Sequence, residues 1–182
     1  MIELTLAEIA EAVDGRLVEG RSGSDASTVV HGGSQTDSRE VEAGHVFFAR
    51  RGEETDGHRF VGTAIDNGAA LVVVEQETDG RGLQIGSTVA LGKLATEVVR
   101  RVRAGGELTI VGITGSNGKT TTKNLVAAMA ERRGTFVASE KSFNNEVGGP
   151  LTMLRVEANT RTLVAEMGAS AEGEIARLTA MA

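Results

Sequence analysis

The stretch Leu108–Lys123, "LTIVGITGSNGKTTTK", constrains the fold of this chain more than any other segment. Its apolar start has the length of a buried strand, and Thr120–Arg133 follows with the periodicity of a helix. Between them, closely spaced glycines precede a lysine and a run of threonines, as in a phosphate loop that aims backbone N–H groups at an anion. The common loop reads G-x-x-x-x-G-K-[ST], which would put its first glycine on Ile113. The segment therefore predicts a strand, a shortened phosphate loop and a helix.

Each part of this loop has a predicted role in binding a nucleoside triphosphate. Glycines allow the turn, the lysine supplies a positive charge for the outer phosphates, and the first threonine supplies a hydroxyl ligand for Mg²⁺. The residues expected to contact ATP are Thr114, Gly115, Ser116, Asn117, Gly118, Lys119, Thr120 and Thr121. The alternative is a glycine-rich turn between a strand and a helix that binds nothing.

A carboxylate, Glu166, ends the apolar segment Thr162–Glu166, which is predicted to be a strand. Parallel sheets present ligand-binding groups at the carboxyl ends of their strands. Mg²⁺ takes hard oxygen ligands and few protein carboxylates. We therefore expect Glu166 and Thr120 to be metal ligands, and Lys119 and Glu166 to be catalytic. The alternative for Glu166 is a surface acid at a strand end.

The segment "SFNNEVGGP" (Ser142–Pro150) places two carboxamides and a carboxylate in a loop with two glycines. Asn144 and Asn145 are candidate substrate-binding residues because such groups are costly to bury without a partner. Asparagine-rich loops are also ordinary turn chemistry, and composition alone leaves both interpretations open.

Alternating strands and helices predict the α/β class, with parallel sheets. A small α/β domain is expected over residues 1–104. The start of a parallel-sheet domain with the phosphate loop is expected over residues 105–182, and the chain stops inside a helix, as a piece of a longer protein would. Strands are expected over His45–Ala49, Ala70–Glu75, Leu108–Ile113, Thr135–Ala138 and Thr162–Glu166. The helices and their inward residues are Leu6, Ile9, Ala10 and Val13 capped by Thr5; Phe60, Val61, Ala64 and Ile65; Leu91–Val102; Leu125, Val126, Met129 and Ala130; Pro150–Leu154; and Glu174–Ala182.

Composition narrows the classes of function. A net charge of −6 counts against a nucleic-acid partner, and the one basic cluster, Arg100–Arg103, fits a solvated helix face. The chain has no cysteine, no basic leader before an apolar run, and no apolar stretch near the about 20 residues that a membrane helix needs. We expect a cytoplasmic monomer without membrane insertion.

Three motifs in this order resemble the Mur ligases, the ATP-dependent amide-bond-forming enzymes of peptidoglycan precursor synthesis. They are "TGSNGKTTTK" (Thr114–Lys123), "FNNEVGGPLTML" (Phe143–Leu154) and "EMGASAEGEI" (Glu166–Ile175). The family's phosphate loop has the shortened form T-G-x-x-G-K-T, which accounts for Ile113. The segment Thr36–Phe60 is similar to the family's uridine-diphosphate-binding domain. Within the family, the motifs most resemble the ligases that add D-alanyl-D-alanine to UDP-N-acetylmuramoyl-tripeptide.

The resemblance implies ATP and Mg²⁺, with Thr120 and Glu166 at the metal and with Asn144 and Asn145 near the substrate and the triphosphate. It implies that the nucleotide end of the UDP-sugar lies near Ser38 and Arg39, and near the loop that contains Gly52, Asp56, Gly57 and His58. His58 also fits a turn or capping residue. A carbamylated lysine and a histidine of the family would lie beyond Ala182, so this chain alone is expected to be inactive.

Three other interpretations remain. The first is the family member that adds the third, diamino acid, which shares the fold and the phosphate loop. The second, from another class, is a non-catalytic module that binds a UDP-sugar. The third is a phosphate-loop kinase or GTPase, which would need a nucleoside-reading motif such as N-K-x-D, and the sequence contains none.

Overall fold

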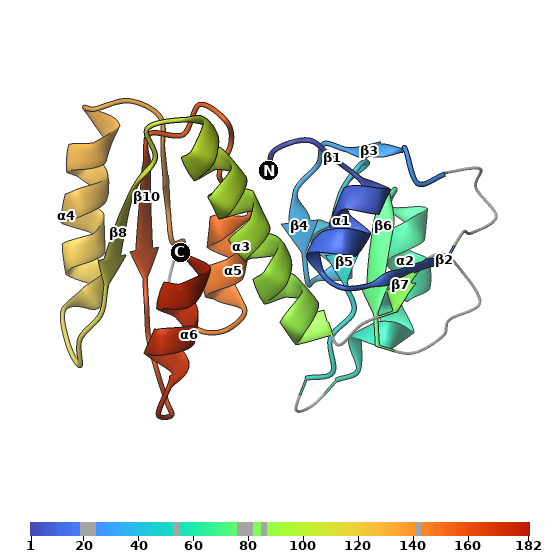
Figure 1. Ribbon diagram of the computed structural model, residues 1–182. Coiled ribbons are helices and arrows are strands. Elements are labelled where there is room, and N and C mark those ends of the chain that lie inside the picture. Colours follow the sequence, from blue (N-terminus) through green and yellow to red (C-terminus); the bar gives the residue numbers. More distant parts are fainter. Residues whose placement is uncertain (19–24, 53–54, 76–81, 85–86, 141–142) are drawn as a thin grey trace. The chain divides into compact units, whose positions relative to one another are not determined.

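The computed structural model describes residues 1–18, 25–52, 55–75, 82–84, 87–140 and 143–182. The chain divides into two compact units between Leu94 and Ala95, within helix α3 (Ser87–Gly105). The buried residues of that helix include Leu91, Leu94 and Val98, which lie on its expected apolar face. Each unit contains its own sheet, in which most strand pairs are parallel (Figure 1), and the α/β class is confirmed.

The sheet of the first unit is centred on two fully buried strands, whose continuous apolar sequences suit strands covered on both faces. Four of its strands are parallel, and only β2 pairs antiparallel, with β7. In sheet order the strands are β2 (Arg16–Val18), β7 (Gly82–Gln84), β6 (Leu71–Val74), β5 (Val46–Phe48) and β4 (Ser34–Gln35), while β1 (Leu4–Thr5) and β3 (Val29–Val30) form a separate antiparallel pair.

Short helices complete the first unit. A capping box fixes the start of α1 (Leu6–Ala12), because Thr5 Oγ1 accepts from the Glu8 N–H and Glu8 accepts from the Thr5 N–H. The others are the 3₁₀ turns η1 (Ser38–Glu40) and η2 (Gly57–Phe60) and helix α2 (Val61–Asp66).

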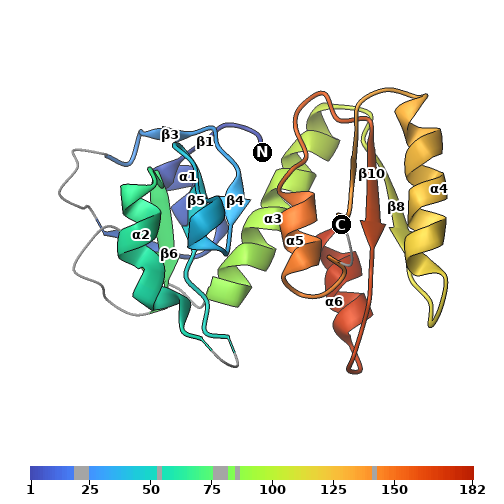
Figure 2. The same cartoon turned by 180° about the vertical axis from the view of Figure 1, so that it is seen from behind.

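The sheet of the second unit has the order β8-β10-β9, and both pairings are parallel. Its strands are β8 (Thr109–Ile113), β9 (Phe136–Ala138) and β10 (Thr162–Glu166), and its further helices are α4 (Lys119–Glu131), α5 (Gly148–Met153) and α6 (Glu174–Met181). Figures 1 and 2 show α4 on one side of this sheet and α5 and α6 on the other. The carboxyl ends of β8 and β10 meet, since Ile113 pairs with Glu166.

Two predicted inward residues of α4 are wrong. Leu125 is 64% exposed and Met129 is 68% exposed. The buried positions of this helix are Lys123 and Ala130, and Val126 packs against the core cluster between them. The spacing 123, 126 and 130 is one helix face, and residues 125 and 129 lie about 100° around the axis from it. A narrow three-stranded sheet covers only that one face.

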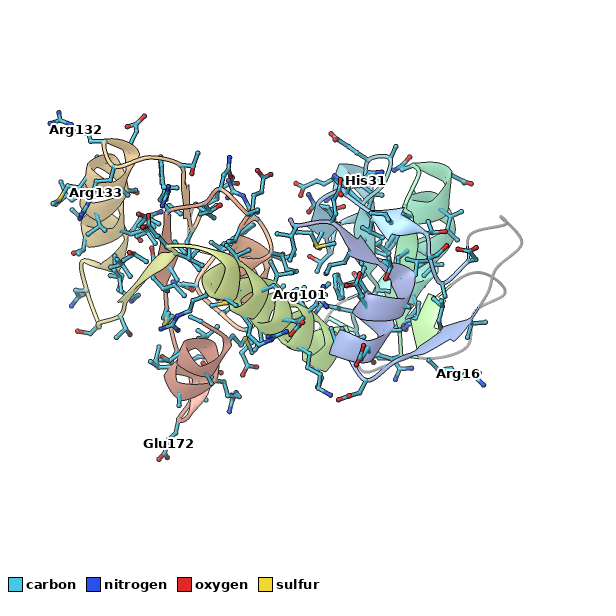
Figure 3. All side chains as sticks on the ribbon, turned by 45° about the horizontal axis from the view of Figure 1, so that its top comes forward. Arg16, His31, Arg101, Arg132, Arg133 and Glu172 are labelled. Carbon is cyan, nitrogen blue, oxygen red and sulfur yellow. The ribbon has the colours of Figure 1, made fainter. Side chains whose placement is uncertain are left out.

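The end of α4 and the start of α2 show two further features. Arg132 and Arg133 project from the C-terminal end of α4 into solvent (Figure 3), where positive charge suits the helix dipole.

Phe60, expected to face inward on α2, instead precedes the helix and is 41% exposed. Its backbone, with φ −105° and ψ 6°, is not α-helical, so Phe60 lies outside the helix whose buried residues are Val61 and Ala64. In the described part of the chain, no helix is both long enough and apolar enough to span a bilayer.

Candidate active site

The phosphate-loop segment connects the end of β8 to the start of α4. Ile113, where the common loop has a glycine, is a core residue that packs with Ala130 and Val164. The turn begins after it, and Gly115 (φ 147°) and Gly118 (φ 77°) both have the positive φ that favours glycine. Residues 114–118 are all exposed, so their backbone is open to a ligand. The loop is therefore shorter than the common form because Ile113, at the end of β8, is part of the core.

The N-terminus of α4 is available to an anion. Gly118, which precedes the helix, provides no side-chain cap for its first N–H groups. Lys119 lies over the loop, and its Nζ donates to the carbonyl oxygen of Gly115 at 2.7 Å. A positive charge, uncapped N–H groups and an open turn are the groups that bind phosphate.

Glu166 is the centre of the site. Glu166 is the last residue of β10 and is only 1% exposed. Its Oε1 accepts from the hydroxyl of Thr120 at 3.2 Å and from Nδ2 of Asn144 at 2.9 Å. Its Oε2 is the one buried side-chain oxygen or nitrogen without a hydrogen-bond partner within the described residues. Burying a carboxylate oxygen without a hydrogen-bond partner costs free energy, so we expect this oxygen to bind a ligand.

The oxygens present fit a magnesium ion. The hydroxyl of Thr120 donates its hydrogen bond to Glu166, so the lone pairs of Thr120 Oγ1 remain available to a cation. Glu166 Oε2 adds a hard anionic oxygen. No group of three or more His, Cys, Asp or Glu side chains suited to a metal occurs in the described ranges. A site with one carboxylate and one hydroxyl suits Mg²⁺, which commonly completes its shell with phosphate oxygens and water.

The loop before α5 divides its polar groups between two tasks. Asn144 holds Glu166, and its backbone carbonyl accepts from the Gly168 N–H at 2.7 Å. Asn145 Oδ1 accepts from the N–H groups of Val147 and Gly148, at 3.1 Å and 2.9 Å, in the turn that leads into α5. Of the two candidates, Asn144 therefore lies at the phosphate-loop site, whereas the side-chain oxygen of Asn145 is bonded within a turn.

Glu146 of the same loop forms an ion pair with Arg177 on α6. This pair joins the loop to the helix after β10.

In the first unit, polar residues follow the carboxyl end of strand β4. Asp37 binds Nε and Nη2 of Arg39, at 2.9 Å and 2.6 Å, and these hydrogen bonds lower the pKa of Asp37 to about 2. The Arg39 side chain is nevertheless 85% exposed, so its outer face is open to an anion. Ser38 is buried, and its carbonyl accepts from Asn67. These two candidates therefore lie together in η1, with only Arg39 open to solvent.

His58 is a structural residue. Its Nε2 accepts from the Glu75 N–H at 2.9 Å, so Nδ1 carries the proton and contacts Asp56 Oδ1 at 2.6 Å. Both ring nitrogens are used in tying the loop after β5 to the end of β6. The interpretation of His58 as a turn residue is confirmed.

Two further polar residues near Glu166 were not predicted from the sequence. Lys123 is 5% exposed, and its Nζ donates to the Ser139 carbonyl at 2.8 Å. The hydroxyl of Ser139 accepts from the Glu166 N–H at 3.0 Å. A signal was present, since Ser139 directly follows a strand, and Lys123 lies one turn after Thr120.

Two family models match the chain. The model of the Mur ligase family, catalytic domain, covers residues 32–106, and the Mur ligase middle domain covers residues 113–182. The chain belongs to the Mur ligase family. The Mur ligase motifs at Thr114–Lys123, Phe143–Leu154 and Glu166–Ile175 all fall in the middle-domain match.

Known Mur ligases match most or all of this chain. It is 40% identical to the UDP-N-acetylmuramoyl-tripeptide–D-alanyl-D-alanine ligase of Mycobacterium leprae over 100% of the chain and 40% of that protein. A crystal structure of MurF from Acinetobacter baumannii matches 98% of this chain and 39% of its own, with a TM-score of 0.85 and 27% identity. MurF from Thermotoga maritima in complex with ADP matches 82% of this chain and 35% of its own, with a TM-score of 0.72 and 35% identity. The chain thus spans about 40% of the length of the curated relatives it matches.

Replacing Gly168 with Ala should displace Asn144. An added Cβ would lie 2.8 Å from Asn144 Cγ and within 2.9 Å of both its carboxamide atoms. We expect the free energy of unfolding, measured in urea, to fall by about 1–3 kcal/mol, as for other overpacked sites.

Gly105→Ala is the matched control, since its Cβ would meet nothing within 4 Å. In an Asn144→Ala background, Gly168→Ala should cost at least about 0.5 kcal/mol less, because the clashing side chain is gone. Equal costs in both backgrounds would show that Asn144 is not the group displaced.

Proposed function

We propose that the full-length protein is an ATP-dependent ligase that joins D-alanyl-D-alanine to UDP-N-acetylmuramoyl-tripeptide during peptidoglycan precursor synthesis. The observation that carries this proposal is the partnerless Oε2 of Glu166 beside the Thr120 hydroxyl, at the end of an open phosphate loop. The name of the Mycobacterium leprae relative supports the choice of substrates. The ADP complex of the Thermotoga maritima relative supports the nucleotide. Because the reaction consumes ATP, we place it in the cytoplasm.

The proposed reaction has two steps. An oxygen of the terminal carboxylate of the tripeptide attacks the γ-phosphorus of ATP, and ADP leaves. The amine of D-alanyl-D-alanine then attacks the carbonyl carbon of the acyl phosphate. The amide bond forms, inorganic phosphate leaves and the nitrogen loses a proton. Both steps place growing negative charge on phosphate oxygens, which is where the protein must supply positive charge.

The residues of the second unit divide this work among them. Lys119 exchanges its bond to the Gly115 carbonyl for the outer phosphates, and the N–H groups of residues 114–121 bind the others. Thr120 and Glu166 would hold Mg²⁺, which supplies charge neutralisation at the phosphates. Asn144 keeps the Glu166 carboxylate oriented. Asn145 would contact substrate through its remaining Nδ2 group.

The first unit would bind the UDP end of the precursor. The open guanidinium of Arg39, held by Asp37, is suited to a diphosphate, and Ser38 orders the turn that carries it. We propose domains over residues 1–104 and 105–182. The first family match ends at residue 106 and the second begins at residue 113, which supports that boundary.

The identity of the added substrate is tested in the full-length enzyme. Each amine substrate is supplied with ATP and its matching UDP-precursor, and phosphate release and product mass are measured. We expect product only with D-alanyl-D-alanine and the tripeptide precursor. Product with a diamino acid and the dipeptide precursor would instead assign the enzyme to the third-residue step. Binding of precursor without turnover of either pair would favour a non-catalytic module.

Lys119→Ala should abolish turnover and leave the affinity for the UDP-tripeptide nearly intact, because Lys119 belongs to the phosphate loop and the UDP end is held by the first unit. Turnover is followed by phosphate release and precursor affinity by calorimetry. Lys93→Ala is the control, since this lysine binds Asp14 in the first unit and should keep full turnover. A large loss of precursor affinity in Lys119→Ala would contradict this division of roles.

A further inference from the structure

The backbone N–H of Glu166 is bonded by a side chain and not by the backbone of the neighbouring strand β9. The ladder between β10 and β9 ends at the pair Val164 and Ala138. The Glu166 N–H lies beyond this ladder, and a buried N–H without a partner is costly. The hydroxyl of Ser139, the first residue after β9, accepts from it at 3.0 Å. Ser139 thus fixes the backbone from which the Glu166 carboxylate projects.

Ser139 is itself held from two directions. Its N–H donates to the Val164 carbonyl at 3.1 Å, which continues the sheet. Its carbonyl accepts from Nζ of Lys123 at 2.8 Å. Ser139 is 3% exposed and Lys123 is 5% exposed, so water does not compete for these bonds. We call this set of hydrogen bonds, from Lys123 through Ser139 to Glu166, the Lys123–Ser139 link.

The link joins the two elements that carry the oxygens of the site. Lys123 lies three residues after Thr120, so both project from neighbouring positions of α4. Thr120 reaches Glu166 through its hydroxyl, and Lys123 reaches the backbone of the same glutamate through Ser139. Helix α4 is therefore tied to the end of β10 at two points about one turn apart.

The choice of lysine at this position is informative. Burying an ammonium group costs free energy unless hydrogen bonds compensate it, and an apolar side chain would fill the same space at lower cost. A purely structural contact between α4 and the sheet is already made by Val126 and Ala130. The long, hydrogen-bonded side chain of Lys123 instead reaches the strand end next to Glu166.

From these contacts we propose that Lys123 and Ser139 are positioning residues that set the placement of Glu166 relative to Thr120, and thereby the affinity of the site for Mg²⁺. This inference rests on the proposed function, because it assumes that the two oxygens bind a metal with nucleotide. Groups behind metal ligands commonly contribute about 10- to 100-fold to metal affinity.

The test measures Mg²⁺-dependent binding of a fluorescent, non-hydrolysable ATP analogue to the full-length protein. Lys123→Met keeps an apolar chain of similar reach and loses the ammonium, and Ser139→Ala loses the acceptor for the Glu166 N–H. Both should raise the Mg²⁺ concentration for half-maximal binding about 10-fold or more. Binding of the analogue in EDTA should stay unchanged, because the link does not contact the phosphate loop's N–H groups.

Two controls separate positioning from general instability. Thr152→Val removes a buried hydroxyl that bonds the Gly148 carbonyl at 2.8 Å, within the same unit and outside the link. It should lower the melting temperature and leave the Mg²⁺ midpoint unchanged. Ser139→Thr keeps an accepting hydroxyl and should stay within about twofold of the wild-type midpoint.

Unchanged Mg²⁺ midpoints in both Lys123→Met and Ser139→Ala, together with lowered melting temperatures, would overturn the positioning role and leave the proposed function standing. If the wild-type protein itself binds the analogue with no Mg²⁺ dependence, the proposed function fails, and the positioning role fails with it. The two failures are therefore distinguished by the wild-type titration alone.

Discussion

The second unit depends on keeping one carboxylate side chain, that of Glu166, buried at the end of strand β10. Burial of a carboxylate is tolerated only when hydrogen bonds or a cation replace the lost water. Thr120 and Asn144 supply hydrogen bonds to Oε1, and the other oxygen has no partner in the described structure. The polar groups that surround it come from α4 and from the loop before α5. The need to satisfy this carboxylate thus couples the phosphate loop to the rest of the unit.

Parallel strand geometry explains why these groups meet. The carboxyl ends of neighbouring parallel strands lie at one edge of a sheet, and ligands bind outside that edge. In the second unit, the phosphate loop follows β8, Ser139 follows β9, and Glu166 ends β10. In the first unit, the Asp37–Arg39 turn follows β4 in the same way. Both units therefore place their polar residues by one topological rule.

The sequence predicted the elements whose periodicity is strong and the site residues whose motif is local. The bounds of β10 and the capping box at Thr5 follow directly from patterns of a few residues. The strands β2, β4 and β7 were missed, because two or three residues are too short to show alternation. The predicted burial of Leu125 and Met129 was wrong, since periodicity gives the apolar arc of a helix but not the width of the sheet beneath it. The Lys123–Ser139 link joins residues far apart in the chain, and only the fold brings them together.

We propose that Glu166 and Thr120 hold the metal that accompanies the nucleotide. The most direct test is anomalous diffraction from crystals of the protein grown with ADP and Mn²⁺, which takes the oxygen ligands of Mg²⁺. We expect one manganese peak at about 2.0–2.3 Å from a Glu166 carboxylate oxygen and from Thr120 Oγ1. The same peak should be lost in Glu166→Gln crystals. A manganese ion bound only by the nucleotide, with Oε1 of Glu166 still bonded to Asn144 and Oε2 without a ligand, would show that Glu166 and Thr120 do not hold the metal.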